Sequence, residues 1–196
     1  MTFVIGLTGS IGMGKTTTAT LFRHAGCAVW DADASVHRLY SKGGEAVDPI
    51  RAAFPNAITN CAVDRAKLKD VISQDPTALE RIESMVHPLV AADRAAFLVA
   101  HDGQIVVLDM PLLFETGADA NMDATIVVSV DAKTQRQRVL ERGTMTESQF
   151  ETILAKQMPD AEKRAKADFI VITDTPEHAG EQVKTILNEI RGKNHA

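Results

Sequence analysis

This 196-residue chain is poor in three features that would each point to a particular class of protein. It has only two cysteines, Cys27 and Cys61, and no Cys/His cluster, which argues against a disulfide framework or a structural zinc site. It has no apolar run near the roughly 20 residues of a membrane-spanning helix, and its start, FVIGL, lacks the basic leader of a signal peptide. Its net charge of −5 does not provide the broad basic surface that nucleic-acid binding requires. We therefore expect a cytoplasmic protein with no membrane or nucleic-acid partner.

The order of apolar runs predicts an α/β fold. Short runs rich in β-branched residues alternate with segments of helical spacing, which is typical of a parallel sheet covered on both faces by helices. A helix is predicted over Lys15–Ala25, and the last helix begins near Pro176 and ends near Arg191. The predicted strands are Phe3–Leu7, Ala28–Asp31, Ile105–Asp109, Ala124–Val130 and Phe169–Ile172.

Two long excursions interrupt this alternation. The first lies between the second and third strands, contains no convincing strand and is longer than a crossover needs, so it predicts a second lobe. Because Pro88 disfavours helical geometry at His87, we expect a break between two of its helices. In the second excursion, from Ala132 to Lys166, Thr146 and Gln149 have the spacing of a capping box that starts a helix through Gln157. The helices predicted in the first excursion are Ala46–Phe54, Arg65–Ser73, Pro76–Val86 and Leu89–Ala100.

A glycine-rich segment between the first strand and the first helix carries the most specific motif. GSIGMGKT, Gly9–Thr16, fits G-x-x-x-x-G-K-[ST] at every fixed position. Its glycines let backbone N–H groups face phosphates, and the helix N-terminus adds a positive dipole end. Lys15 is expected to reach the β- and γ-phosphates and Thr16 to hold Mg²⁺. The alternative is a flexible turn with a capping threonine, but motif and context together favour nucleotide binding.

The missing motifs narrow the class of nucleotide-binding protein. The chain has no NKxD-like guanine reader and no DxxG segment, as a switch GTPase would, and it is too short for a large ATPase machine. A small-molecule kinase needs a lid, an acceptor pocket and a base, and the two excursions leave room for the lid and the pocket. The rivals are a kinase of nucleosides or nucleoside monophosphates and a nucleotide-dependent binding switch that transfers nothing.

Acidic residues follow two of the predicted strands. Asp31 and Asp33 lie at the carboxyl edge of the sheet, where such folds bind ligands. A carboxylate there could accept the proton of an attacking hydroxyl, or the DAD segment could simply cap the helix Ala34–Tyr40. Asp109 ends IVVLD like the carboxylate of a Walker B element and would hold the magnesium shell through water, or it is merely solvated. The residues alone leave both pairs of readings open.

Other side chains have a functional and a structural reading. Arg138 and Arg142 lie one helical turn apart, so they share a face that could bind phosphate oxygens or simply be solvated. Lys163, Arg164 and Lys166 form either a basic patch toward an anionic substrate or a solvated helix face. Pro111–Phe114 is an apolar turn that either packs or shapes an acceptor cleft.

The motifs together resemble the dephospho-coenzyme A kinase family, whose members transfer the γ-phosphoryl group of ATP to the ribose 3′-hydroxyl of dephospho-CoA, the last step of coenzyme A synthesis. This resemblance implies a three-layer P-loop kinase fold with a five-stranded parallel sheet, and Mg²⁺ as cofactor. It says nothing of oligomeric state. The segments that carry it, in matching order, are GLTGSIGMGKTTT, VWDAD (Val29–Asp33), MVHPLV (Met85–Val90), LDMPLLFE (Leu108–Glu115), TQRQRVLER (Thr134–Arg142) and KQMPDAEKRAKADF (Lys156–Phe169).

The resemblance also implies roles for single residues. Asp33 matches the catalytic base, and Lys15 and Arg138 would assist transfer. His87 and Leu112 would contact the substrate together with Asp33, and Thr16 and Asp109 would serve the metal. The expected ATP contacts are Gly12, Met13, Gly14, Lys15, Thr16, Thr17, Arg138 and Arg142.

The resemblance divides the chain into three parts and has departures. Residues 1–33, 102–131 and 167–196 would form the nucleotide-binding core, residues 34–101 the dephospho-CoA lobe, and residues 132–166 the lid. Ser10 replaces a frequent glycine, Met13 is bulkier than usual, and Thr173–Thr175 replaces an aspartate-asparagine ending near the expected adenine site.

Overall fold

The computed structural model describes residues 2–193, which divide into two compact units. Of these residues, 2–29 and 101–193 belong to one unit, and Trp30–Ala100 form the other. Each unit has its own cluster of buried apolar side chains. Within the described residues, no helix has the length and hydropathy that crossing a membrane would require.

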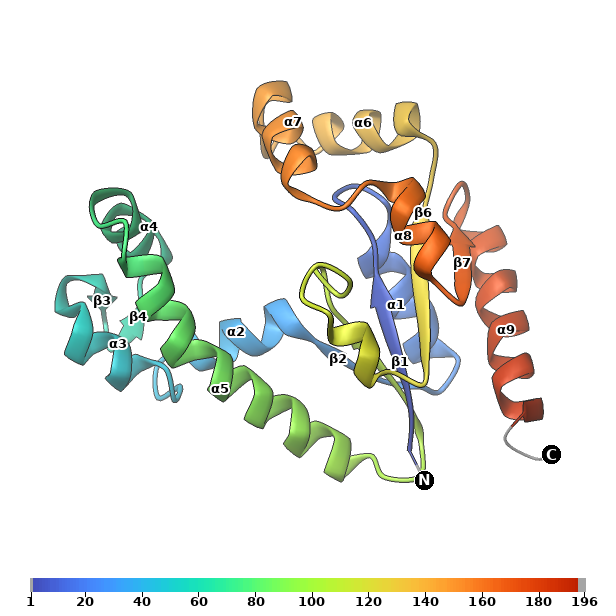
Figure 1. Ribbon diagram of the computed structural model, residues 1–196, viewed down its shortest axis with the longest axis horizontal. Coiled ribbons are helices and arrows are strands. Elements are labelled where there is room, and N and C mark those ends of the chain that lie inside the picture. Colours follow the sequence, from blue (N-terminus) through green and yellow to red (C-terminus); the bar gives the residue numbers. More distant parts are fainter. Residues whose placement is uncertain (1, 194–196) are drawn as a thin grey trace. The chain divides into compact units, whose positions relative to one another are not determined.

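A five-stranded parallel sheet organises the first unit (Figure 1). β1 pairs in parallel with both β5 and β6, and β6 pairs in parallel with β7. The order across the sheet is β2-β5-β1-β6-β7. This confirms the predicted α/β class, and each predicted strand is found within one residue of its bounds. The strands are β1 (Phe3–Thr8), β2 (Ala28–Asp31), β5 (Ile105–Asp109), β6 (Ala124–Ser129) and β7 (Phe169–Ile172).

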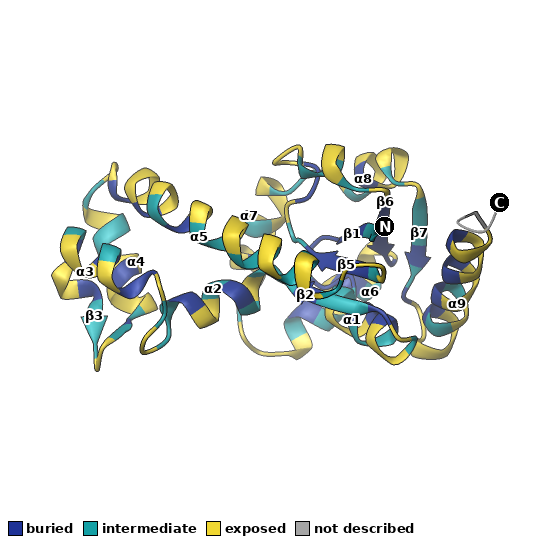
Figure 2. Ribbon diagram, turned by 90° about the horizontal axis from the view of Figure 1, so that it is seen from below, coloured by how far each residue is buried: buried dark blue, intermediate teal, exposed yellow. Residues whose placement is uncertain are grey.

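Side-chain alternation along the strands separates the two faces of this sheet. Ile5 and Val128 are fully buried in one cluster with side chains of α1 (Lys15–His24) and α9 (Pro176–Lys193). The buried residues of α9 line one side of that helix (Figure 2). Ser129, the neighbour of Val128, donates instead to Asp160 of α8 at 2.7 Å, so α8 covers the opposite face. The helices that follow β6 are α6 (Ala132–Glu141), α7 (Glu147–Lys156) and α8 (Asp160–Lys166).

A glycine allows a close approach on that opposite face. A Cβ atom at Gly6 would lie 2.8 Å from Cδ2 of Leu113, closer than real contacts allow. The loop after β5 therefore packs directly on β1, and Leu113 is fully buried there. The capping box predicted for α7 is also present, since Thr146 and Gln149 each accept from the backbone N–H of the other.

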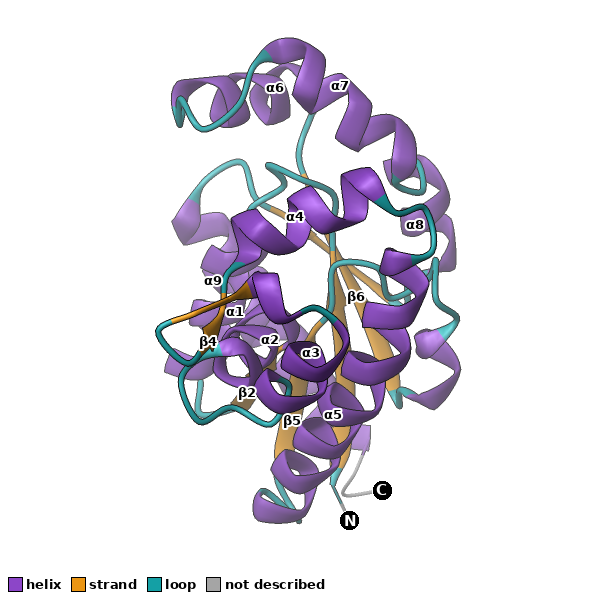
Figure 3. Cartoon of the chain, turned by 90° about the vertical axis from the view of Figure 1, so that its left-hand side faces the viewer, coloured by secondary structure: helices purple, strands orange, loops and turns teal. Residues whose placement is uncertain are grey.

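The second unit is mainly helical but contains a small hairpin that the sequence reasoning missed (Figure 3). β3 (Ile58–Thr59) and β4 (Ala62–Val63) pair antiparallel. Asn60 and Cys61 between them both have positive φ, 50° and 61°, as a two-residue hairpin turn with matching twist requires. Asparagine is common in such turns, but the second position holds cysteine instead of the usual glycine, so the sequence did not indicate a turn. The helices of this unit are α2 (Ala32–Tyr40), α3 (Val47–Ala53), η1 (Pro55–Ala57), α4 (Arg65–Gln74) and α5 (Ala78–Ala100).

The predicted break at His87-Pro88 is wrong, because α5 runs through both residues without interruption. Proline cannot donate to the carbonyl of Ser84 one turn earlier. Ser84 and Pro88 lie on the exposed side of the helix, where water can bind that carbonyl, whereas Ile82 and Val86 are buried on the other side. After the proline, the partly buried Leu89 and Val90 pack against the same apolar cluster, so packing holds the two halves of the helix in line.

We expect Pro88→Ala to stabilise the second unit, because alanine restores the hydrogen bond to Ser84 and favours the helix. The free energy of unfolding should rise by about 1–3 kcal/mol, measured by urea denaturation followed by circular dichroism. Glu83→Ala, at an exposed neighbouring position of α5, should change it by less than about 0.5 kcal/mol. An unchanged stability in Pro88→Ala would contradict a continuous helix.

Candidate functional site

The phosphate loop joins β1 to α1 and depends on two glycines with left-handed backbone. Gly12 has φ of 79° and Gly14 has φ of 92°, a region that other residues rarely adopt. Gly14 is the N-cap of α1, and a Cβ atom there would lie 3.0 Å from Oγ1 of Thr173. The first N–H groups of a helix have no partner within the helix, so the start of α1 forms an anion site.

An ion pair occupies the side of this loop. The ammonium group of Lys15 pairs with the carboxylate of Asp109 at the end of β5. Asp109 is only 2% exposed, so the reading of a solvated aspartate is wrong. Thr16 follows Lys15 with an exposed side chain. A hydroxyl and a carboxylate are oxygen ligands of the kind that Mg²⁺ prefers.

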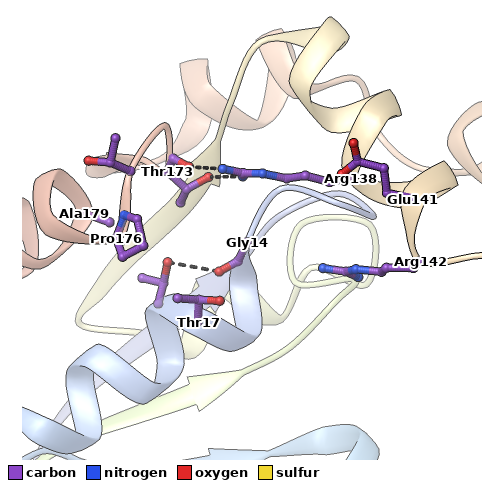
Figure 4. A pocket seen from close by; sticks show the side chains of 10 residues that line it. Gly14, Thr17, Arg138, Glu141, Arg142, Thr173, Pro176 and Ala179 are labelled. Atoms are coloured by element: carbon purple, nitrogen blue, oxygen red, sulfur yellow. Dashed lines mark hydrogen bonds between the residues drawn. The ribbon is translucent and has the colours of Figure 1, made fainter.

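A cavity of about 400 Å³ lies beside the phosphate loop (Figure 4). Its walls come from the loop and α1, from α6, and from the segment after β7. Both arginines singled out from the sequence line it, and Figure 4 shows their side chains extending from α6 and its end. The cavity therefore offers positive charge next to the anion site. Its lining residues include Gly14, Thr17, Arg138, Arg142, Thr173 and Pro176.

Thr173 connects the wall of this cavity to the phosphate loop. Arg138 donates to the carbonyl oxygen of Thr173 at 2.6 Å and to its hydroxyl oxygen at 3.2 Å. The hydroxyl in turn donates to the carbonyl oxygen of Met13 at 2.7 Å. Thr173, which departs from the family pattern, is thus a structural contact of both Arg138 and the loop. No local pattern in the sequence indicated this role.

An ion pair with a fully buried lysine lies between the loop after β5 and α8. Nζ of Lys163 is 2.9 Å from Oε1 of Glu115, and that oxygen also accepts from the N–H of Met158 at 3.0 Å. The Lys163 side chain is 0% exposed, so the reading of this lysine as part of a basic or solvated face is wrong. Burial raises the pKa of Glu115, but the ammonium group and the N–H group outweigh it and hold the pKa below its usual value. Sequence reasoning missed this pair because its members are far apart in the chain.

In the second unit, the two aspartates of DAD have different environments. Oδ1 of Asp31 accepts from the N–H of Ala34 at 2.9 Å and caps α2. Asp33 lies in the first turn of α2 with an exposed side chain, for which residues 2–193 provide no hydrogen bond or ion pair. Asp31 is therefore the N-cap of α2, and the carboxylate of Asp33 is not needed for capping.

A third aspartate ties α2 to α5 within the same unit. Oδ2 of Asp93 accepts from Nε1 of Trp30 and from the guanidinium group of Arg38, each at 2.7 Å. Burial raises the pKa of Asp93, but these donors outweigh it and keep the pKa below its usual value. The helix that carries Asp33 is thus held at both ends.

The remaining predicted substrate contacts are both exposed. His87 lies on the exposed side of α5, and Leu112, in the first unit, is 45% exposed. The next two residues, Leu113 and Phe114, are buried, so the apolar turn after β5 is divided between packing and an accessible leucine.

Comparison with known proteins points to one family. The family model described as "Dephospho-CoA kinase" matches residues 3–178. A curated "Dephospho-CoA kinase" from Ruegeria pomeroyi is 59% identical over 99% of this chain and 98% of the relative. Its counterpart from Cereibacter sphaeroides is 57% identical over 96% of each.

Solved structures share the fold. The crystal structure of TT1252 from Thermus thermophilus has a TM-score of 0.84 and 30% identity, and the match covers 95% of this chain and 97% of that one. A dephospho-CoA kinase from Campylobacter jejuni has a TM-score of 0.68 and 20% identity, with 96% and 97% covered.

We expect Glu115→Gln to destabilise the first unit, because it leaves the ammonium group of Lys163 buried without a counter-charge. Removing one partner of a buried ion pair costs about 3–5 kcal/mol of the free energy of unfolding, measured by urea denaturation at pH 7. The double variant Glu115→Gln/Lys163→Met should recover most of the loss, since no buried charge remains. A double variant as unstable as the single one would contradict this account.

The ion pair between Lys163 and Glu115 also makes the stability of the first unit depend on pH. Because the pKa of Glu115 is lowered in the folded state, its stabilising contribution is present above the usual glutamate pKa and is lost as the pH falls through the lowered value. The stability of the wild type relative to the double variant should therefore fall below about pH 4.

Proposed function

This chain belongs to the dephospho-CoA kinase family, which catalyses the last step of coenzyme A synthesis, and we propose that it transfers the γ-phosphoryl group of ATP to the ribose 3′-hydroxyl of dephospho-CoA. The observation that carries this proposal is the phosphate loop, with its open helix N-terminus beside a cavity that two arginines line.

ATP would place its base and ribose in this cavity and its phosphates at the start of α1. The N–H groups of the loop then face the phosphate oxygens. Lys15 exchanges the carboxylate of Asp109 for the β- and γ-phosphates, a movement of its flexible side chain alone. Arg138 and Arg142 supply guanidinium groups to the charge that spreads over the transferring phosphoryl group.

Thr16 and Asp109 fit a magnesium ion, Thr16 through its hydroxyl and Asp109 through a water molecule. Mg²⁺ usually keeps several waters and binds proteins through few side chains plus the phosphates of a substrate. When bound, it neutralises charge on the β- and γ-phosphate oxygens.

Asp33 acts as the general base in this proposal. The 3′-oxygen attacks the γ-phosphorus, the bond from that phosphorus to the β,γ-bridging oxygen breaks, and Asp33 accepts the proton of the hydroxyl. The lobe of residues 34–101, with His87, and the exposed Leu112 would receive dephospho-CoA. Closure of residues 132–166 would exclude water and limit hydrolysis of ATP.

The overall activity is tested by a mass-spectrometric product assay with Mg-ATP and, separately, dephospho-CoA, AMP, CMP, dTMP and adenosine. We expect CoA from dephospho-CoA and no comparable product from the other acceptors. Phosphorylation of a monophosphate would assign the chain to the rival class of nucleotide kinases. Release of ADP without any phosphorylated acceptor would overturn transfer to the ribose hydroxyl.

The base is tested by Asp33→Asn, which keeps the shape of the side chain and removes its basicity. We expect kcat to fall about 10²–10⁴-fold with little change in ATP affinity, measured by steady-state kinetics and nucleotide titration. Asp31→Asn is the matched control, since asparagine also caps helices, and it should stay close to wild type. Loss of transfer in Asp31→Asn but not in Asp33→Asn would reverse the assignment.

A further inference from the structure

Two glutamine side chains close on one residue of the phosphate loop. Oε1 of Gln157 accepts from the N–H of Ile11 at 3.1 Å, and Nε2 of Gln135 donates to the carbonyl oxygen of Ile11 at 2.7 Å. A backbone N–H can only donate and a carbonyl can only accept, so Ile11 fixes the orientation of both amides. Gln135 lies on α6, and Gln157 is the C-cap of α7.

These contacts belong to a tightly packed region. Gln135 is 3% exposed, and a Cβ atom at Gly12 would lie 2.5 Å from Cγ2 of Val139 on the same helix. α6 therefore rests directly on the loop. The neighbouring backbone is also engaged, since the N–H of Met13 donates to the carbonyl of Ser10 at 3.1 Å.

Peptide planarity turns this contact into a statement about phosphate binding. No peptide bond of residues 2–193 is cis, so each carbonyl points opposite to the N–H of the next residue. When Gln135 holds the carbonyl of Ile11, it sets the direction of the Gly12 N–H. Thr173 does the same for Gly14 by holding the carbonyl of Met13. Within the described residues, the N–H groups of Gly12 and Gly14 have no hydrogen-bond partner.

Glycine at position 12 makes such a restraint necessary. Its φ of 79° and its lack of a side chain leave the Ile11–Gly12 peptide plane free to rotate if nothing holds it. We propose that Gln135 and Gln157 are positioning residues that hold this peptide and its predecessor so that the Gly12 N–H faces the nucleotide phosphates. This inference rests on the proposed function, in that the anion is a nucleotide phosphate.

The test uses two pairs of charge-matched variants. Gln157→Glu keeps an acceptor for the Ile11 N–H, whereas Gln135→Glu places a carboxylate against the Ile11 carbonyl and removes its donor. Gln135→Lys keeps a donor for that carbonyl, whereas Gln157→Lys places an ammonium group against the N–H. Each pair adds the same charge beside the same residue, so an unspecific effect of charge is common to both members.

We expect a crossed pattern in ATP affinity, measured by calorimetric titration of Mg-ATP in the absence of acceptor. Gln135→Glu should bind about tenfold more weakly than Gln157→Glu, and Gln157→Lys about tenfold more weakly than Gln135→Lys, the scale of one lost hydrogen bond. The KM for ATP should follow the same order, and the KM for dephospho-CoA should not.

Equal effects of the two positions within both pairs would overturn the proposal, because they would show only a charge effect or a general structural role. Thermal unfolding of each variant gives its folded fraction, and the ATP affinity is calculated for the folded protein alone. If one pair does not fold, the other pair still decides between a crossed and an uncrossed order. Wild-type protein that binds no Mg-ATP would refute the nucleotide site itself, whereas wild-type binding with an uncrossed order would refute only the two glutamines.

Discussion

A phosphate loop depends on one constraint of the peptide group: if its N–H groups face an anion, the carbonyls of the same peptides face the protein and need donors there. In this chain the donors come from side chains far along the sequence. The hydroxyl of Thr173, after the last strand, donates to the carbonyl of Met13, and the amide of Gln135 donates to the carbonyl of Ile11. The loop motif near the start of the chain therefore specifies a binding site only after the end of the sheet and α6 have folded against it.

Two lysines of the first unit are each paired with an acidic residue of the same short segment. Asp109, the last residue of β5, neutralises Lys15, and Glu115, in the loop that follows, neutralises Lys163. Leu113 between them is fully buried against Gly6, so the loop has little freedom. One rigid segment thus holds counter-charges for a lysine of the phosphate site and for a lysine buried in the scaffold. In the proposed function Lys15 leaves Asp109 for the nucleotide phosphates, whereas Lys163 has a fully buried side chain and stays paired with Glu115.

The sequence was informative where a feature depends on neighbouring residues. The strands, the phosphate loop and the capping box at Thr146 are local patterns, and all are present. Local rules failed where packing decided the outcome. Pro88 does not end α5, because buried side chains on the far side hold the helix, and Lys163 is not solvated, because a glutamate distant in sequence meets it. The hairpin turn at Asn60 was missed because its second residue is a cysteine.

The site repeatedly divides structural and chemical work between adjacent groups. Asp31 caps α2 and thereby leaves the carboxylate of Asp33 without a structural task. In the phosphate loop, the carbonyl of Ile11 is held by Gln135, and the N–H of Gly12 in the same peptide is left open. A reactive or binding group must be unpaired yet fixed in direction, and a fully solvated group would not be fixed. In the Ile11–Gly12 peptide, anchoring the carbonyl meets both conditions, because the planar peptide group transmits the orientation to the N–H group.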